Sequence, residues 1–275
     1  MARTRTRIDR PGMDYVSHLG PYRVAAGDLT VAGMPGSVFA PVPRAGFSTT
    51  DVPVVAFAHG WLQPVRRYAD TLRYFASWGI VAVAPATETG PFPSHLGFAA
   101  DLNTSLQLAV HTRLGNGEVT VDPERLGLAG HSLGGGVAVL AAGVNDKVKA
   151  VATVNTGDTK PSAVTSAGLL TIPGLHLVGG KDSITPADTN GERIARAWAG
   201  PVQLRTLKKA AHLSVAEGSH WTNSLIGDAG DKGVQHLARM LMTAFFLQHL
   251  SGQEQLAEDL DGKIAGTELE DLTEE

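Results

Sequence analysis

Apolar residues occur along the chain in short continuous runs, which alternate with stretches where they recur about every three or four positions. A continuous run is typical of a strand buried on both faces, and the longer spacing is typical of an amphipathic helix. We predict strands at 52–58, 80–84, 125–129, 148–154, 174–178 and 202–207. We predict helices at 66–77, 98–113, 134–142, 192–198 and 234–250.

Strands that alternate with helices indicate βαβ units, whose right-handed crossovers place helices on both faces of a parallel sheet. The first part of the chain differs, because apolar residues there alternate with polar or small ones between glycines, at 22–24, 29–31 and 37–39. Such alternation predicts short antiparallel strands at one sheet edge. We therefore predict an α/β fold with a doubly wound, mostly parallel sheet of about eight strands.

The length of 275 residues, with 43% hydrophobic and 18% charged residues, provides the apolar material for one large core. We predict a single domain at 21–250, preceded by a flexible arm at 1–20. From residue 251 onward, nine acidic residues stand against Lys263 alone. Because a like-charged terminal run usually stays in solvent, we predict an acidic tail at 251–275, with a short helix around Leu256 and Leu260 as the alternative.

Composition excludes several classes of site. The chain contains no cysteine, so it has no disulfide, no thiolate nucleophile and no cysteine-bound metal. A net charge of −4 argues against nucleic acid as a partner. We expect no cofactor and no metal, because the chain has neither a phosphate-binding loop, nor a dinucleotide fingerprint, nor a zinc-binding His-Glu-x-x-His.

The N-terminal arginines at positions 3, 5, 7 and 10 are not followed by an apolar segment, so no secretory signal is expected and a cytoplasmic location is predicted. A membrane-spanning helix needs roughly 20 consecutive apolar residues, and no stretch of the chain approaches this. We therefore expect no membrane span.

The pentapeptide Gly130-His131-Ser132-Leu133-Gly134 carries the strongest chemical signal in the chain. A Gly-x-Ser-x-Gly sequence between a strand and a helix forms a tight turn that presents the serine hydroxyl above a sheet. Short motifs also arise by chance in glycine-rich chains, but here a strand is predicted at 125–129 and a helix at 134–142. We therefore predict that Ser132 is the nucleophile of a serine hydrolase.

A serine hydroxyl needs a base to take its proton and a carboxylate to orient that base. On this kind of sheet the chain order is serine, acid, histidine, with the last two in loops that follow later strands. Asp182 follows the strand at 174–178 and is the predicted acid. The competing carboxylate is Asp158, one strand earlier.

The base is predicted by the same rule. His212 follows the strand at 202–207 after four residues, and His220 lies further along the same loop. We favour His212, since the shorter distance from the strand end holds it better, and we keep His220 as the alternative.

An oxyanion hole requires two preset hydrogen-bond donors. We predict the main-chain N–H of Leu133, directly after the nucleophile, and that of Trp61, in the loop after the strand at 52–58. The stretch between 155 and 174 is short for a lid, which predicts an open cleft. Its substrate-binding residues are predicted to be Gly60, Leu62, Asn155 and Thr156.

These residues resemble the α/β-hydrolase superfamily, and within it the bacterial cutinase-like polyester hydrolases, with related chlorophyllase-like and dienelactone-hydrolase-like esterases. The resemblance covers about residues 18 to 250 and rests on Gly20-Pro21-Tyr22, His59-Gly60-Trp61, Gly130-His131-Ser132-Leu133-Gly134-Gly135, Asp182-Ser183-Ile184-Thr185-Pro186 and His212. It implies nucleophile Ser132, acid Asp182, base His212, and oxyanion donors Trp61 and Leu133.

The chain also departs from these relatives. The secreted polyester hydrolases usually carry a signal peptide and a C-terminal disulfide, and the dienelactone hydrolases proper use a cysteine nucleophile. None of these features occurs here. The resemblance therefore implies ester hydrolysis rather than polymer hydrolysis.

We expect a carboxylic ester hydrolase that forms an acyl-enzyme and acts on a small-molecule ester. Two alternatives stay open. One is an acyltransferase or another serine hydrolase acting on a thioester, lactone or amide, since the same acyl-enzyme serves all of them. The other is a non-catalytic ligand-binding protein on the same fold. The sequence does not determine which ester is cleaved or whether the chain forms a homo-oligomer.

Overall fold

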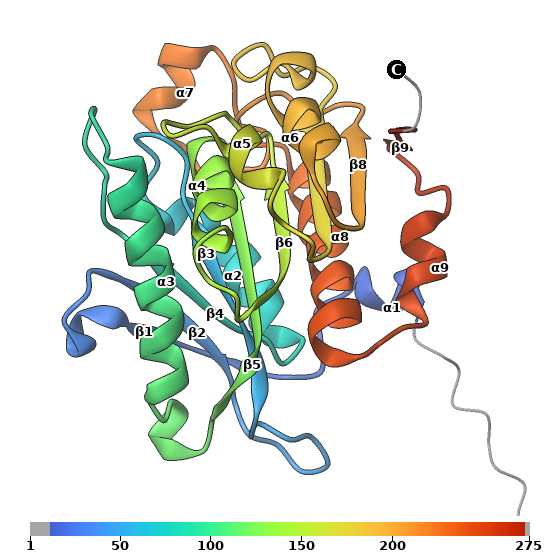
Figure 1. Cartoon of the computed structure of the whole chain (residues 1–275). Coiled ribbons are helices and arrows are strands. Elements are labelled where there is room, and N and C mark those ends of the chain that lie inside the picture. The colour runs from blue at the N-terminus through green and yellow to red at the C-terminus, as the bar shows by residue number, and fades with distance from the viewer. Residues whose placement is uncertain (1–11, 273–275) are drawn as a thin grey trace, which may run out of the picture.

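The apolar runs of the sequence form the centre of a nine-stranded sheet in the computed structural model, which describes residues 12–272 (Figure 1). The strand order is β1-β2-β4-β3-β5-β6-β7-β8-β9. Six neighbouring strands of this sheet are parallel: β4 (Val81–Pro85), β3 (Val52–Ala58), β5 (Val121–His131), β6 (Val148–Val154), β7 (Gly174–Gly179) and β8 (Val202–Leu207). The predicted mostly parallel sheet is therefore confirmed, with nine strands in place of about eight.

Antiparallel strands close both edges of the sheet. At one edge β1 (Val24–Asp28) pairs with β2 (Gly36–Pro41), as the alternating pattern predicts. The prediction of a strand at 29–31 is wrong, because Leu29–Ala32 forms the 3-10 turn η1. The side chain of Asp28 causes this local turn by accepting the N–H of Thr30 at 2.8 Å.

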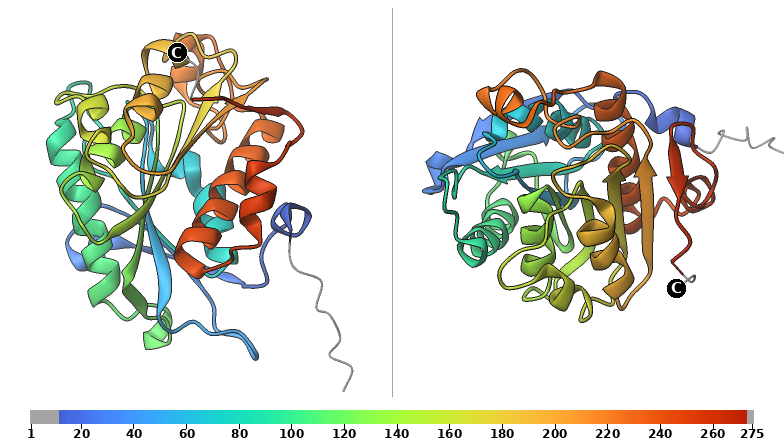
Figure 2. Two further views of the ribbon diagram at one scale, coloured as in Figure 1. Left: turned by 45° about the vertical axis from the view of Figure 1, so that its right-hand side comes forward. Right: turned by 90° about the horizontal axis from the view of Figure 1, so that it is seen from above.

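Helices cover both faces of the sheet, which Figure 2 shows from the side. The apolar core is divided accordingly into two large clusters, one on each face. One face carries α3 (His95–His111), α4 (Leu133–Ala142), α5 (Ala163–Ala167) and α6 (Gly191–Ala197). The other face carries α1 (Met13–Val16), α2 (Ala69–Ser77), α8 (Lys232–Ser251) and α9 (Leu256–Asp261).

Four short elements lie in the connections between strands. They are the 3-10 turns η2 (Val65–Tyr68), η3 (Gly115–Gly117) and η4 (Ala187–Thr189), and the helix α7 (Trp221–Ile226) between β8 and α8. Within residues 12–272, no helix combines the length and the apolar composition that crossing a bilayer requires.

Residues 12–20 pack on the domain, in contrast to the flexible arm predicted for 1–20. Val16 of α1 is fully buried. The main-chain N–H of Met13 donates to Asp259 at 2.8 Å, and that of Gly20 donates to Ser77 Oγ at 2.9 Å. The first bond joins the start of the described chain to α9, and the second joins it to α2. The rest of the predicted arm, 1–11, lies outside the described residues.

The segment predicted as a solvated acidic tail is also part of the fold as far as residue 272. Leu256 and Leu260 lie one helical turn apart on α9 and are both buried, so the helix considered as the alternative forms. Beyond it, β9 (Thr267–Leu269) pairs with β8 as the ninth strand. Two buried leucines outweigh the acidic composition because the charged side chains can stay at the surface of the helix.

Candidate active site

Ser132 lies on a strained turn where β5 ends and α4 begins. Its backbone has φ 57° and ψ −126°, a conformation that residues other than glycine rarely adopt. The turn also requires glycine on both sides of Ser132. A Cβ on Gly130 would lie 2.1 Å from the oxygen of Gly134, and a Cβ on Gly134 would lie 2.1 Å from the oxygen of Ala58. The spacing of the pentapeptide thus follows from the close approach of three main-chain segments.

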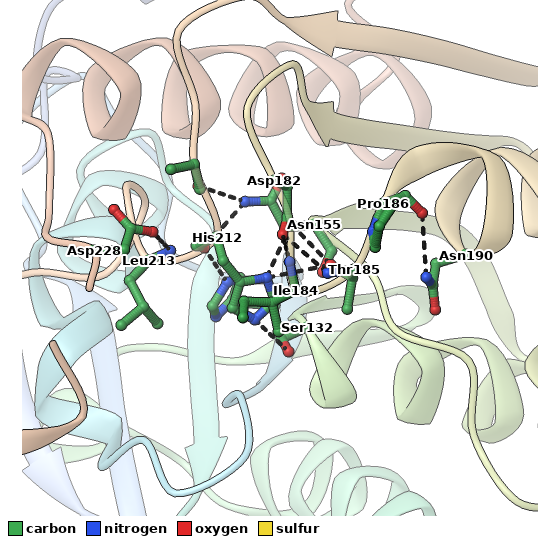
Figure 3. A network of polar contacts seen from close by, with 12 residues as sticks. Ser132, Asn155, Asp182, Ile184, Thr185, Pro186, Asn190, His212, Leu213 and Asp228 are labelled. Atoms are coloured by element: carbon green, nitrogen blue, oxygen red, sulfur yellow. Dashed lines mark hydrogen bonds and ion pairs between the residues drawn. The ribbon is translucent and has the colours of Figure 1, made fainter. Parts of the chain in front are cut away.

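The structure brings Ser132, His212 and Asp182 together in one hydrogen-bonded line (Figure 3). Nε2 of His212 lies 2.9 Å from Oγ of Ser132, and Nδ1 lies 2.9 Å from Oδ2 of Asp182. The three residues follow β5, β8 and β7, whose C-terminal ends meet at one edge of the sheet. All three side chains are buried.

The carboxylate of Asp182 is held by its own loop. Oδ1 accepts the main-chain N–H groups of Ile184 and Thr185, both at 2.9 Å, and Oδ2 accepts the hydroxyl of Thr185 at 2.8 Å. Burial on its own would raise the pKa of Asp182, but the bonds from His212 and Thr185 together lower it below its usual value. Asp182 is therefore ionised at neutral pH.

An ionised carboxylate can only accept hydrogen bonds, and this fixes the proton on His212. Nδ1 carries the hydrogen and donates it to Asp182, so Nε2 has a free lone pair that faces the Ser132 hydroxyl. In this tautomer the imidazole is arranged to accept a proton from the serine.

The alternative acid and base lie elsewhere. His220 precedes α7, where its Nδ1 contacts the hydroxyl of Thr222 at 2.9 Å. The main-chain N–H of His220 donates to Oδ1 of Asn223 at 3.0 Å. The carboxylate of Asp158 accepts the hydroxyl of Ser162 and the N–H of Ala163, at the start of α5. Both residues therefore serve helix starts, and neither is bonded to Ser132 or to His212.

The two predicted oxyanion donors lie at the start of a helix and in a turn, and both residues line the same pocket. Leu133 is the first residue of α4, and Trp61 lies in the turn that follows β3. In the part of the chain that the structure describes, neither main-chain N–H donates to a protein acceptor. Both N–H groups are therefore available, and the one at Leu133 also carries the positive end of the α4 dipole.

A pocket of about 420 Å³ opens beside Leu133. The indole of Trp61 is fixed there by its N–H, which donates to the oxygen of Pro91 at 3.0 Å. Phe92 is 96% exposed, so its ring is available to a ligand. The residues lining the pocket are Trp61, Pro91, Phe92, Pro93, His95 and Leu133. The sequence offered no signal for the loop at 91–95, which follows β4.

The four residues predicted to bind substrate do not line this pocket. Gly60, Asn155 and Thr156 are buried, and Leu62 is half-buried in the turn beyond Trp61. The amide of Asn155 instead donates to the main-chain oxygens of Ala211 and His212, at 2.9 and 3.0 Å. Asn155 and Thr156 are as buried as Ser132 and His212, and their part in substrate binding stays a prediction.

Sequence reasoning missed a second set of buried polar residues behind the site. His131, the variable residue before Ser132, is fully buried, with Nδ1 2.8 Å from the hydroxyl of Tyr68 and Nε2 2.9 Å from the oxygen of His212. A histidine at the end of an apolar strand was the available signal, since a buried imidazole needs polar partners. Among the described residues, no three histidine, aspartate or glutamate side chains are grouped to hold a metal ion.

The family model described as Chlorophyllase matches residues 25–158. No curated protein matches the sequence. The matched segment runs from β1 to just beyond β6 and includes Ser132 and Trp61, whereas Asp182 and His212 lie outside it. With the mostly parallel sheet, the match identifies an α/β-hydrolase fold and indicates an ester hydrolase, which confirms the predicted fold.

Proposed function

We propose that the chain is a cofactor-independent carboxylic ester hydrolase in which Ser132 is the nucleophile, His212 the base and Asp182 the acid that orients it. One observation carries the proposal: the unbroken hydrogen-bonded line from Ser132 Oγ through His212 to Asp182. The line matches the arrangement that a serine needs in order to become nucleophilic at neutral pH.

The first half of the reaction acylates the enzyme. Oγ of Ser132 attacks the ester carbonyl carbon while its proton passes to Nε2 of His212, and the carbonyl oxygen becomes an oxyanion. Asp182 stabilises the resulting imidazolium. As the carbonyl re-forms, the bond to the alcohol oxygen breaks, and Nε2 gives its proton to the departing alcohol. The products are a free alcohol and an acyl group on Ser132.

The second half repeats these steps with water. His212 takes a proton from a water molecule, whose oxygen attacks the acyl carbon of the acyl-enzyme. Collapse of this second intermediate releases the carboxylic acid, and the proton on His212 returns to Oγ of Ser132. The enzyme leaves the cycle unchanged, with one water consumed for each ester cleaved.

In both halves the N–H groups of Trp61 and Leu133 are proposed to hold the oxyanion. Each such donor typically contributes about 3 kcal/mol to transition-state stability. The support is that neither group has a protein acceptor among residues 12–272, that Leu133 directly follows Ser132, and that Trp61 lines the same pocket as Leu133. Because the turn at Ser132 is fixed by close main-chain contacts, the donor at Leu133 does not need to reorganise during reaction.

The substrate is proposed to be a small-molecule ester with an apolar group in the pocket between Trp61, Phe92 and Leu133. An open cleft without a large lid is supported by the segment between β6 and β7, which contains only the five-residue helix α5. Apolar walls with few polar groups are usual for small-molecule sites.

The proposal is tested with Ser132→Ala and a short-chain nitrophenyl ester. Loss of the nucleophile should lower kcat by about 10⁴-fold or more, since the triad acts as a unit. A fluorophosphonate probe should form a single adduct on Ser132 of the unchanged protein, found by peptide mass spectrometry. The matched control is Ser105→Ala, which removes another buried serine, on α3, and should keep full activity.

Two results would contradict the proposal. One is hydrolysis by Ser132→Ala at the rate of the unchanged protein. The other is a folded protein that neither hydrolyses esters nor reacts with the probe, which would favour a ligand-binding role.

A further inference from the structure

The main-chain oxygen of His212 accepts two hydrogen bonds from buried side chains. Nε2 of His131 lies 2.9 Å from it and Nδ2 of Asn155 lies 3.0 Å from it. His131 ends β5 and Asn155 follows β6, so each reaches the histidine loop from a neighbouring strand. The main chain at His212 is thus attached to the rigid sheet directly beneath Ser132.

The partners of His131 determine which of its nitrogens carries the hydrogen. A carbonyl oxygen only accepts, so Nε2 must donate to the oxygen of His212. Burial and the neighbouring His212 lower the pKa of His131 to about 3, which leaves the ring neutral. Nδ1 is therefore an acceptor, and it takes the hydroxyl hydrogen of Tyr68 at 2.8 Å.

Tyr68 continues the chain of bonds toward the opposite side of the site. Its oxygen accepts the N–H of Gly60 at 3.1 Å, and burial raises the pKa of the phenol, which therefore keeps its proton. Gly60 immediately precedes Trp61, the proposed oxyanion donor. Each donor in this series of hydrogen bonds has one acceptor. The N–H of Gly60 donates to the Tyr68 oxygen, the Tyr68 hydroxyl donates to Nδ1 of His131, and Nε2–H of His131 donates to the main-chain oxygen of His212.

We infer that His131 is a positioning residue, which fixes the main chain of the proposed base and connects it through Tyr68 to the loop of the proposed oxyanion donor. The inference rests on the proposed function. It assigns no contact with substrate to His131, whose ring lies 5.1 Å from the ring of His212.

Such positioning matters because the reaction depends on the distance between Nε2 of His212 and Oγ of Ser132, which is 2.9 Å. His212 lies in a loop, where the main chain is held by hydrogen bonds rather than by a ladder of strand partners. A misplacement of about 1 Å can lower a rate about a hundredfold. Loss of the bond from His131 should therefore affect turnover more than binding.

The test compares His131→Leu with His131→Gln, because an amide keeps one donor and one acceptor while leucine keeps only the volume. We expect kcat to fall between about ten- and a hundredfold in His131→Leu, with KM within about twofold of the unchanged protein. His131→Gln should recover most of the lost kcat. The rate of fluorophosphonate labelling at Ser132 should follow kcat in both variants.

His176→Leu is the matched control for a merely structural effect. His176 on β7 is also fully buried, its pKa is also lowered to about 3, and its Nδ1 also lies 2.8 Å from a hydroxyl, that of Thr153. It has no contact with the His212 loop among the described residues. His176→Leu should lose stability to a similar extent and keep the kcat of the unchanged protein.

Equal kcat in His131→Leu and His176→Leu would overturn the inference, and so would a His131→Gln variant as slow as His131→Leu. If His131→Leu does not fold, Tyr68→Phe replaces it, since it removes the hydrogen bond to Nδ1 and keeps the ring. An unchanged kcat in Tyr68→Phe then overturns the inference.

The failure of the inference is separable from that of the proposed function. If Ser132→Ala is inactive while the His131 variants have normal kcat, only the inference fails. If Ser132→Ala is active, the proposed function itself fails.

Discussion

The hydroxyl of Thr185 donates to Oδ2 of Asp182 at 2.8 Å, and the same carboxylate oxygen faces Nδ1 of His212. Thr185 also lies 3.0 Å from the main-chain oxygen of Asn155. The charged carboxylate is the stronger of the two acceptors, so the hydroxyl hydrogen points toward Asp182. Thr185 therefore helps to orient the Asp182 carboxylate toward His212.

Replacing Thr185 by valine removes this hydroxyl and keeps the shape of the side chain. A hydrogen bond to a charged group is worth about 1.5 to 3 kcal/mol, so we expect kcat on a nitrophenyl ester to fall about tenfold or more. Thr185→Ser keeps the oxygen and should stay within about twofold of the unchanged protein. A valine variant as active as the serine variant would show that the N–H groups of Ile184 and Thr185 are sufficient.

His212→Ala and His220→Ala should differ sharply in activity. His212→Ala removes the proposed base and should lower kcat by about 10⁴-fold or more. His220→Ala should leave kcat within about twofold of the unchanged protein. It should lower the free energy of unfolding by about 1 kcal/mol, because His220 is the N-cap residue of α7. Steady-state kinetics and thermal melts of both variants check this, and a comparable loss of kcat in His220→Ala would contradict the assignment of the base.

The elements that the sequence predicts well are those with a local cause. The strands β3, β4 and β7 appear as largely apolar runs because both of their faces are buried, whereas β8 alternates apolar with polar residues and is partly exposed. The approach of Asp182 to His212 could be predicted because each lies in the loop that follows a parallel strand, and the strand ends of a parallel sheet meet at one edge. The pentapeptide around Ser132 could be recognised because close main-chain contacts leave no room for a Cβ at Gly130 and Gly134.

The elements that escape prediction have causes distant along the chain. The role of Asn155 depends on the oxygens of Ala211 and His212, which are more than 50 residues away, so no local pattern indicates it. The strand β9 forms because β8 offers it an open edge, although its own sequence is short and acidic. The loop at 91–95 becomes a pocket wall only through its contact with Trp61.

Arg205 should be important for the stability of the C-terminal segment. Its guanidinium is buried on β8 and donates to the oxygens of Leu260 and Gly262 and to the hydroxyl of Thr267. Arg205→Met would leave these acceptors buried without a donor, and we expect a loss of about 2 to 4 kcal/mol in the free energy of unfolding.

The control for Arg205 is Lys208→Met on the same edge. Lys208 pairs with Glu268 at 3.1 Å, but both side chains are more than half exposed, so its loss should change stability by less than about 0.5 kcal/mol. Urea unfolding of the two variants gives the comparison. Equal stability of Arg205→Met and Lys208→Met would mean that the C-terminal segment contributes little to the fold.

Acid should destabilise the protein through His176 well before its carboxylates are protonated. Burial lowers the pKa of His176 from an ordinary value of 6.5 to about 3. Below pH 6.5 the unfolded chain therefore binds a proton at His176 that the folded chain does not, until the pH reaches about 3. The stability linked to this residue is fully present above pH 6.5 and declines by about 1.4 kcal/mol per pH unit as the pH falls through this window.

His176→Leu lacks this proton-binding site, so its stability should fall less steeply in acid than that of the unchanged protein. Urea unfolding at several values between about pH 6.5 and about pH 4.5 should show the two stability curves converging by about 1.4 kcal/mol per unit. Parallel curves would mean that His176 is protonated equally in the folded and unfolded chains. In that case the folded protein would have to admit water or a counter-charge to the pair that His176 forms with Thr153, since a charged imidazole needs one or the other when buried.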